Sequence, residues 1–104
     1  MLLTPEDMVK QMNNIEDILT ERSKTHGEYA THCKMAQDMK VVVRNSPNSA
    51  KLTPAMMDGL DMIIHKVARV LNGNPFHKDH WDDIAGYATL VSKELSLSLT
   101  TKDK

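Results

Sequence analysis

Thr4-Pro5 and Thr53-Pro54 constrain the fold of this chain most, because each pair marks the start of a helix. Threonine is a preferred N-cap residue, and proline suits the first helical position, where its missing N–H is not needed. After each pair, apolar residues recur every three or four positions, as in a helix that buries one face. The sequence therefore predicts one helix that ends before Gly27 and another that ends near residues 72–73.

Two further helices are expected from the same periodicity, one from residue 28 or 29 to 44 and one over 79–97. Residues 45–52 form a loop between helices, and residues 100–104 are expected to fray. The positions expected to face the core are Met8, Met12, Ile15 and Leu19, then Tyr29, Cys33, Ala36, either Met39 or Lys40, and Val43, then Leu60, Ile63, Ile64, Val67 and Leu71, and finally Trp81, Ile84, Ala88, Val91 and Leu95. We predict an all-α fold in which residues 1–104 form a single domain. Its four helical segments form a bundle that homo-oligomerisation completes.

Composition excludes several classes of protein. A chain of 104 residues with a formal net charge of -1 lacks the basic face of a sequence-independent nucleic-acid binder, so we expect no direct DNA binding. Cys33 is the only cysteine, which excludes an internal disulfide and a multi-cysteine zinc site. No signal peptide or run of membrane length is evident, so we expect no membrane contact and a cytoplasmic location.

Arg22 and His26 occupy the positions where the apolar repeat of the first helix would continue. Basic residues suit a helix C-terminus, so the repeat can simply emerge into solvent there. The alternative is a polar pocket that faces an anion at one end of the bundle. Both interpretations stay open at the level of sequence.

Acidic residues gather at the predicted start of the fourth helix. Asp79 and Asp83 are four residues apart and project from one side of that helix, while Asp61 lies at the edge of the third helix's apolar face. Carboxylates held close together usually share a proton or a cation, and Mg²⁺ prefers oxygen ligands. The competing interpretation is that Asp79 is an ordinary N-cap and that its neighbours are solvated.

Three runs resemble a small family of uncharacterised proteins carried by tailed phages and prophages: ERSKTHGEY at 21–29, LDMIIHKVARVL at 60–71 and DHWDDIAGYA at 79–88. More remotely, the layout is similar to the MazG-like all-α nucleoside triphosphate pyrophosphohydrolases. That similarity implies Mg²⁺ bound by acidic pairs on neighbouring helices, here Asp58-x-x-Asp61 with Asp79-x-x-Asp82 or His80-x-x-Asp83. It also implies cleavage of nucleoside triphosphates to monophosphate and pyrophosphate.

Three functional hypotheses follow. In the first, Asp61, Asp79 and Asp83 bind Mg²⁺, and Asp61 and Asp83 are the catalytic pair. The residues expected to bind the nucleotide are Arg22, His26, Tyr29, Lys66 and Arg69. In the second, the chain sequesters nucleotides without cleaving them, including the cyclic signalling nucleotides of host anti-phage defence. For a phage-encoded chain, the expected cytoplasmic location is that of the host cell. Aspartates in place of the family's glutamates favour this second hypothesis. In the third, the chain is a protein-interaction module.

Overall fold

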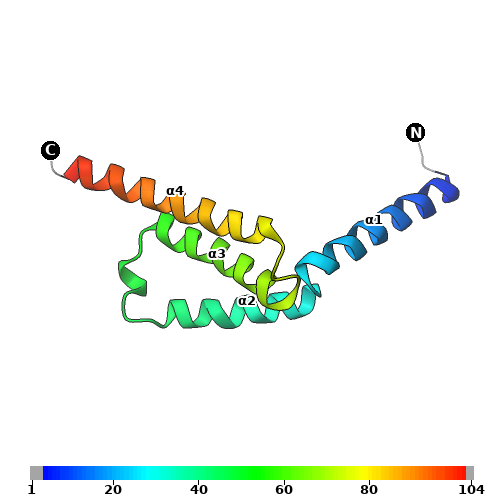
Figure 1. Ribbon diagram of the computed structural model, residues 1–104, viewed down its shortest axis with the longest axis horizontal. Coiled ribbons are helices and arrows are strands. Elements are labelled where there is room, and N and C mark those ends of the chain that lie inside the picture. Colours follow the sequence, from blue (N-terminus) through cyan, green and yellow to red (C-terminus); the bar gives the residue numbers. More distant parts are fainter. Residues whose placement is uncertain (1–3, 103–104) are drawn as a thin grey trace.

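The computed structural model describes residues 4–102, and the side chains of residues 4–99, and it consists of helices joined by short connections (Figure 1). The elements are α1 (Pro5–His26), α2 (Tyr29–Arg44), the short 3-10 helix η1 (Ser49–Lys51), α3 (Pro54–Asn72) and α4 (Lys78–Lys102). No strand occurs within residues 4–102. The all-α class and the four helices are confirmed, and α2, α3 and α4 pack together as a bundle.

The helix boundaries follow the capping signals of the sequence. The Thr4 side chain accepts a hydrogen bond of 3.1 Å from the backbone N–H of Asp7, and Thr53 accepts one of 3.2 Å from Met56. The loop expected at 45–52 contains η1. At the other end, α4 continues to Lys102 and so covers part of the expected tail, whereas residues 103–104 lie outside the described residues.

The core lies where α2 and α4 pack on either side of α3. Ala36, Ile64 and Ala68 are its buried apolar residues, and small side chains at two of these positions let α2 approach α3 closely. On the opposite side of α3, Gly59 lies against Val91 of α4, so that any side chain at this position would collide with the valine. The sequence therefore positions α3 as the central helix.

One face of α3 remains uncovered between its two neighbours. Leu60 and Leu71, both expected in the core, are 37% and 64% exposed. The prediction that Trp81 faces the core is also wrong. Its side chain is 54% exposed, and its Nε1 donates a hydrogen bond of 2.9 Å to the carbonyl oxygen of Pro75. These helices thus carry more apolar side chains than their neighbouring helices cover.

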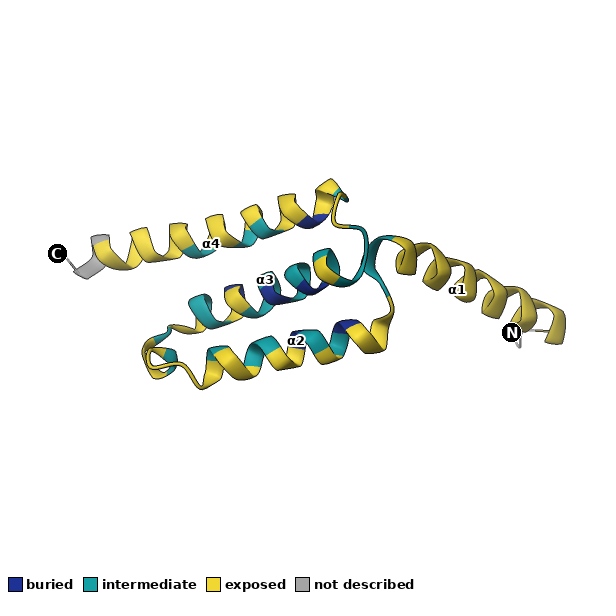
Figure 2. Ribbon diagram, turned by 60° about the horizontal axis from the view of Figure 1, so that its bottom comes forward, coloured by how far each residue is buried: buried dark blue, intermediate teal, exposed yellow. Residues whose placement is uncertain are grey.

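Helix α1 projects away from the other three helices (Figure 1). It contains no buried residue, and Figure 2 shows it exposed along nearly its whole length. The molecule is consequently 64 Å long, with a radius of gyration of 18.9 Å. A compact domain of this length has a radius of gyration of about 13 Å. The apolar repeat of α1 is therefore left uncovered by the helices of residues 4–102.

The base of α1 is nevertheless attached firmly. The carbonyl oxygen of Thr25 accepts hydrogen bonds from the backbone N–H of Asn74 at 2.9 Å and from Nε2 of His80 at 2.8 Å. The Asn72 side chain donates to the carbonyl oxygen of Glu28 at 3.0 Å. Between α1 and α2, Gly27 has a φ of 80°, a conformation that favours glycine. These contacts connect the α1–α2 turn to the α3–α4 connection and fix the direction in which α1 leaves.

Candidate functional site

A pocket of about 350 Å³ lies at the base of α1, where three helices meet. Its lining residues are Leu19, Arg22 and His26 of α1, Tyr29 and His32 of α2, and Arg69 of α3. The lining contains two arginines and no acidic residue. This composition favours an anionic ligand, because a guanidinium group binds phosphate or carboxylate oxygens in a two-pronged geometry.

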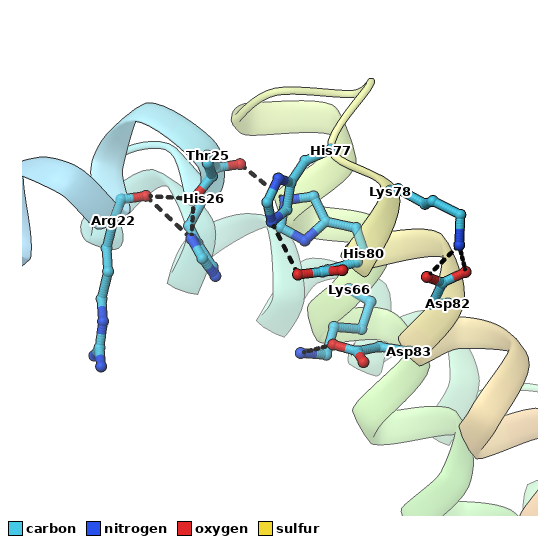
Figure 3. Close-up of polar contacts among 10 residues, drawn as sticks. Arg22, Thr25, His26, Lys66, His77, Lys78, His80, Asp82 and Asp83 are labelled. Atoms are coloured by element: carbon cyan, nitrogen blue, oxygen red, sulfur yellow. Dashed lines mark hydrogen bonds and ion pairs between the residues drawn. The ribbon is translucent and has the colours of Figure 1, made fainter.

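Helical spacing and the Gly27 turn bring the lining together. Arg22 and His26 are four residues apart on the last turns of α1, and the backbone carbonyl of Arg22 lies 3.1 Å from Nδ1 of His26. The turn then reverses the chain, so that Tyr29 and His32 on the first turn of α2 face the same space. Figure 3 shows the side chains of Arg22 and His26 beside the junction of α1 with the α3–α4 connection.

A chain of hydrogen bonds runs behind the pocket from α2 to α3 and back. Lys40 Nζ lies 3.0 Å from Nε2 of His65, and Nδ1 of His65 lies 3.1 Å from Nε2 of His32. An ammonium group only donates, so His65 accepts through Nε2 and carries its proton on Nδ1. His32 must then accept through Nε2 and carry its own proton on Nδ1. That protonation is assigned from the hydrogen-bond network.

Nδ1 of His32 is buried and has no hydrogen-bond partner among residues 4–102. An N–H group left in this state costs about 1–3 kcal/mol, which stable cores avoid and functional sites often retain. His32 is only 8% exposed. Its ring lies nearly parallel to that of Tyr29, at a centroid distance of 6.4 Å, and meets His65 edge to edge through the hydrogen bond between their ring nitrogens. The pocket wall therefore contains two nearly parallel rings, those of Tyr29 and His32.

The histidines of the site are held in their neutral form. Burial is the main cause that lowers the pKa values of His26, His32 and His65, and nearby cations lower them further. The positive charge of Arg69 acts on all three, and that of Lys40 acts on His32 and His65. The pocket consequently has a positive potential that neutral imidazoles do not reduce, and an anion would be attracted to it.

A second group of histidines forms the rear of the same junction. The rings of His26 and His80 meet edge to face at a centroid distance of 5.1 Å, and those of His77 and His80 at 4.7 Å. His80 is 2% exposed and is anchored to Thr25, as Figure 3 shows. His80 thus connects α4 to the end of α1 and supports His26 from behind.

The three aspartates predicted to bind a metal lie apart, each beside a different basic residue: an arginine, a histidine and a lysine. Asp61 lies 3.8 Å from Arg44 of α2, Asp79 lies 3.7 Å from His77, and Asp83 lies 2.9 Å from Lys66. The hydrogen bond from Lys66 is the main cause that lowers the pKa of Asp83. Within the described part of the chain, no group of three His, Cys, Asp or Glu side chains is close enough to hold a metal ion. The residues of a single chain therefore do not fit a shared Mg²⁺ ion.

Four of the five residues predicted to bind a ligand line the pocket, namely Arg22, His26, Tyr29 and Arg69. Lys66 does not line it, although its charge reaches His26 and His65. His65 of α3 lies outside the lining too, and its side chain faces α2.

His32 is the lining residue that the sequence interpretation missed. It lies three residues after Tyr29 and four before Ala36, so helical spacing alone places it on the packed side of α2. That spacing could have identified His32 as a residue that faces the site.

Comparisons with known proteins place the chain in a family. Within residues 4–102, no helix is long and apolar enough to cross a membrane. A search of curated proteins found no match, and neither did a search of solved structures. A family model described as a domain of unknown function, DUF6378, matches residues 10–95, a range that includes every residue of the pocket and all of α2 and α3. The chain belongs to the DUF6378 family.

Proposed function

We propose that this chain binds a phosphate-bearing small molecule, and specifically a nucleotide, in the pocket at the base of α1. One observation carries the proposal: Arg22 and Arg69 reach the same pocket from different helices, and its lining contains no carboxylate to neutralise them. Two guanidinium groups without an acidic partner offer a phosphate group several charge-assisted hydrogen bonds.

The rings beside the arginines support a nucleotide rather than a simple inorganic anion. Tyr29 is 81% exposed, and its ring lies nearly parallel to that of His32, with an interplanar angle of 13°. An exposed flat ring beside a cationic pocket offers a surface on which a nucleobase can stack. Leu19 adds an apolar edge to the same wall. The lining thus offers contacts to both the phosphate and the base of a nucleotide.

Thermal unfolding with a panel of nucleotides tests the proposal. The panel contains nucleoside mono- and triphosphates and cyclic dinucleotides, each with and without Mg²⁺, and the ligand is recovered afterwards and identified by chromatography. Binding to the folded state raises the melting temperature in proportion to the logarithm of ligand concentration. Stabilisation with the ligand recovered unchanged is the result expected of a protein that sequesters nucleotides. No shift with any member of the panel would refute nucleotide binding.

A matched pair of variants locates the ligand. Arg22→Gln removes one positive charge from the pocket lining, whereas Lys24→Gln removes the same charge from an exposed residue two positions away that pairs with Glu21. We expect Arg22→Gln to reduce nucleotide affinity at least tenfold and Lys24→Gln to reduce it less than twofold. Equal effects of the two variants would mean that net charge attracts the ligand and that the pocket does not bind it.

Hydrolysis of nucleoside triphosphates to monophosphate and pyrophosphate is a second candidate, favoured by Asp61. Oδ1 of this carboxylate is buried and has no hydrogen-bond partner in the described part of the chain, which is a state that a bound cation would relieve. Because the aspartates of one chain lie apart, we assign no reaction step to a metal here. Recovery of monophosphate and pyrophosphate in the presence of Mg²⁺, and loss of this turnover in Asp61→Asn, would establish the hydrolase.

A further inference from the structure

The apolar repeat of α1 forms a continuous strip along a helix that nothing in the described chain covers. Its members are Met8, Met12, Ile15 and Leu19, which are between 53% and 60% exposed, with Val9 and Ile18 beside them at 56% and 51%. The spacing alternates strictly between four and three residues, which is the heptad repeat of helices that pair with another helix. A globular helix that covers its own domain normally has a broader apolar face. We call these four residues the α1 seam.

We propose that the α1 seam pairs with the α1 seam of a second copy of this chain, with the two helices antiparallel. The pairing does not depend on what the pocket binds.

The chain exposes enough surface to bury an interface with a second copy. The chain exposes 8124 Å². A compact monomer of 11.7 kDa exposes about 5,900 Å² by the usual scaling of surface with mass. The excess of about 2,200 Å² is larger than the roughly 800 Å² that each partner buries in a standard stable interface. A chain that buried part of this surface against a second copy would come closer to the surface-to-mass ratio of an ordinary globular protein.

Charge decides the direction of the pairing. The first turn of α1 is acidic, with Glu6 and Asp7, and its last turn is basic, with Lys24 and His26. In a parallel pair, Arg22 would continue the seam and face Arg22 of the second copy, so two positive charges would meet. In an antiparallel pair, Met8 lies opposite Leu19 and Met12 opposite Ile15 of the second copy. Arg22 then lies opposite Pro5 of the second copy, within one turn of Glu6 and Asp7.

This arrangement also has a consequence for the pocket. Leu19 and Arg22 belong both to the α1 repeat and to the pocket lining. The antiparallel pair brings the first turn of α1 from the second copy to the rim of the pocket, so that each pocket would be completed by two chains.

The oligomeric state of the full chain tests the pairing. We expect light scattering after size-exclusion chromatography to give at least twice the chain mass of 11.7 kDa at 50 µM, a concentration of roughly the order at which modest interfaces assemble. Ile15→Glu places a charge in the middle of the seam and should shift the protein to monomer. Asn14→Glu adds the same charge to an exposed residue of α1 outside the seam and should leave the assembly intact. Circular dichroism verifies that α2, α3 and α4 remain folded in both variants.

Single cysteines test the direction. In a Cys33→Ser background, Met8→Cys and Leu19→Cys are prepared separately and then mixed under oxidising conditions. Positions 8 and 19 are about 16 Å apart along a helix, so only the antiparallel pair places position 8 of one copy beside position 19 of the other. We expect the mixture to form the mixed disulfide and the separate proteins to form little.

Three results would overturn the proposal. The first is a monomeric wild-type protein, and the second is a disulfide between identical positions. The third is an assembly that survives Ile15→Glu but is lost in Leu60→Glu, which would place the interface on the open face of α3.

Discussion

His80 and Thr25 are 55 residues apart, and a hydrogen bond of 2.8 Å from His80 Nε2 to the Thr25 carbonyl oxygen joins them. This bond connects the first turn of α4 to the last turn of α1. Because α1 has no buried residue of its own, its orientation depends on contacts of this kind at its base. The pocket depends on them too, since Arg22 and His26 belong to the same last turns of α1.

Replacing His80 should therefore destabilise the protein. His80→Ala removes a ring that is 2% exposed together with the bond to Thr25, and we expect it to lower the free energy of unfolding by about 2–4 kcal/mol. His80→Gln retains an amide donor and should recover part of that loss. Denaturant unfolding measures both variants. If His80→Ala unfolds like the wild type, the bond does not anchor α1.

Two glycines in the last third of the chain should respond in opposite ways to alanine. A side chain at Gly73 would collide with the backbone of Thr25 and His26, so Gly73→Ala should cost about 1–3 kcal/mol of stability through overpacking. Gly86 lies inside α4 with open space around it, so Gly86→Ala should stabilise the helix by about 1 kcal/mol. Thermal unfolding compares the two. A neutral Gly73→Ala would show that the α3–α4 connection does not touch the end of α1.

Stability should fall as the solution becomes mildly acidic. Burial, assisted by the charge of Arg69, lowers the pKa values of His26, His32 and His65 from their ordinary value of 6.5. The unfolded chain then binds more protons than the folded chain near and below pH 6.5. The free energy that these neutral histidines contribute to stability is fully present above pH 6.5. It is lost as the pH falls from 6.5 towards their lowered pKa values. Unfolding between pH 7.5 and 5.5 measures it, and Arg69→Gln should flatten the curve.

The affinity for an anion should increase as the pH falls, in contrast to stability. A phosphate group beside His26 and His32 would raise their pKa values, so binding takes up protons and affinity increases as the pH falls. We expect a cyclic dinucleotide, whose phosphodiesters do not titrate near neutrality, to bind more tightly at pH 6 than at pH 8. Titration calorimetry in two buffers of different ionisation enthalpy would count the protons. Affinity that does not change with pH would place the phosphate away from these histidines.

The aspartates at the start of α4 should differ sharply in their contribution to stability. Lys66 is 12% exposed and has Asp83 at 2.9 Å, so Asp83→Ala leaves a largely buried ammonium group without its carboxylate. Asp82 pairs with Lys78, whose side chain is 82% exposed, and such surface pairs contribute little. We expect Asp83→Ala to lower the melting temperature by several degrees and Asp82→Ala to leave it nearly unchanged. Equal effects would mean that the ammonium group of Lys66 becomes hydrated when Asp83 is replaced.

The helices themselves could be predicted because their signals are local. Thr4 and Thr53 act within three residues of their partners, and Gly27 needs only its own backbone conformation to end α1. Residues of the site on one helix were also predictable, since Arg22 and His26 share a face through spacing alone. The polar interruption of the α1 repeat left open whether the helix end emerges into solvent or faces an anion in a pocket, and the structure places these two residues in a cavity with Tyr29 and Arg69.

The tertiary structure decided which faces meet. Periodicity gives the direction of a side chain around its own helix, but it contains no information on which neighbour lies there. Asp61 and Asp83 illustrate this: both are on the helices predicted for them, yet Asp61 turns to Arg44 of α2 and Asp83 to Lys66 of α3.

The histidine chain from Lys40 through His65 to His32 likewise joins residues that are up to 33 positions apart. The sequence by itself determined the helices, their ends and their apolar strips, because these depend on interactions over three or four residues. The packing of α3 between α2 and α4, and the projection of α1 away from them, depend on contacts across the whole chain. Only the tertiary structure could therefore place the pocket and leave the α1 seam uncovered.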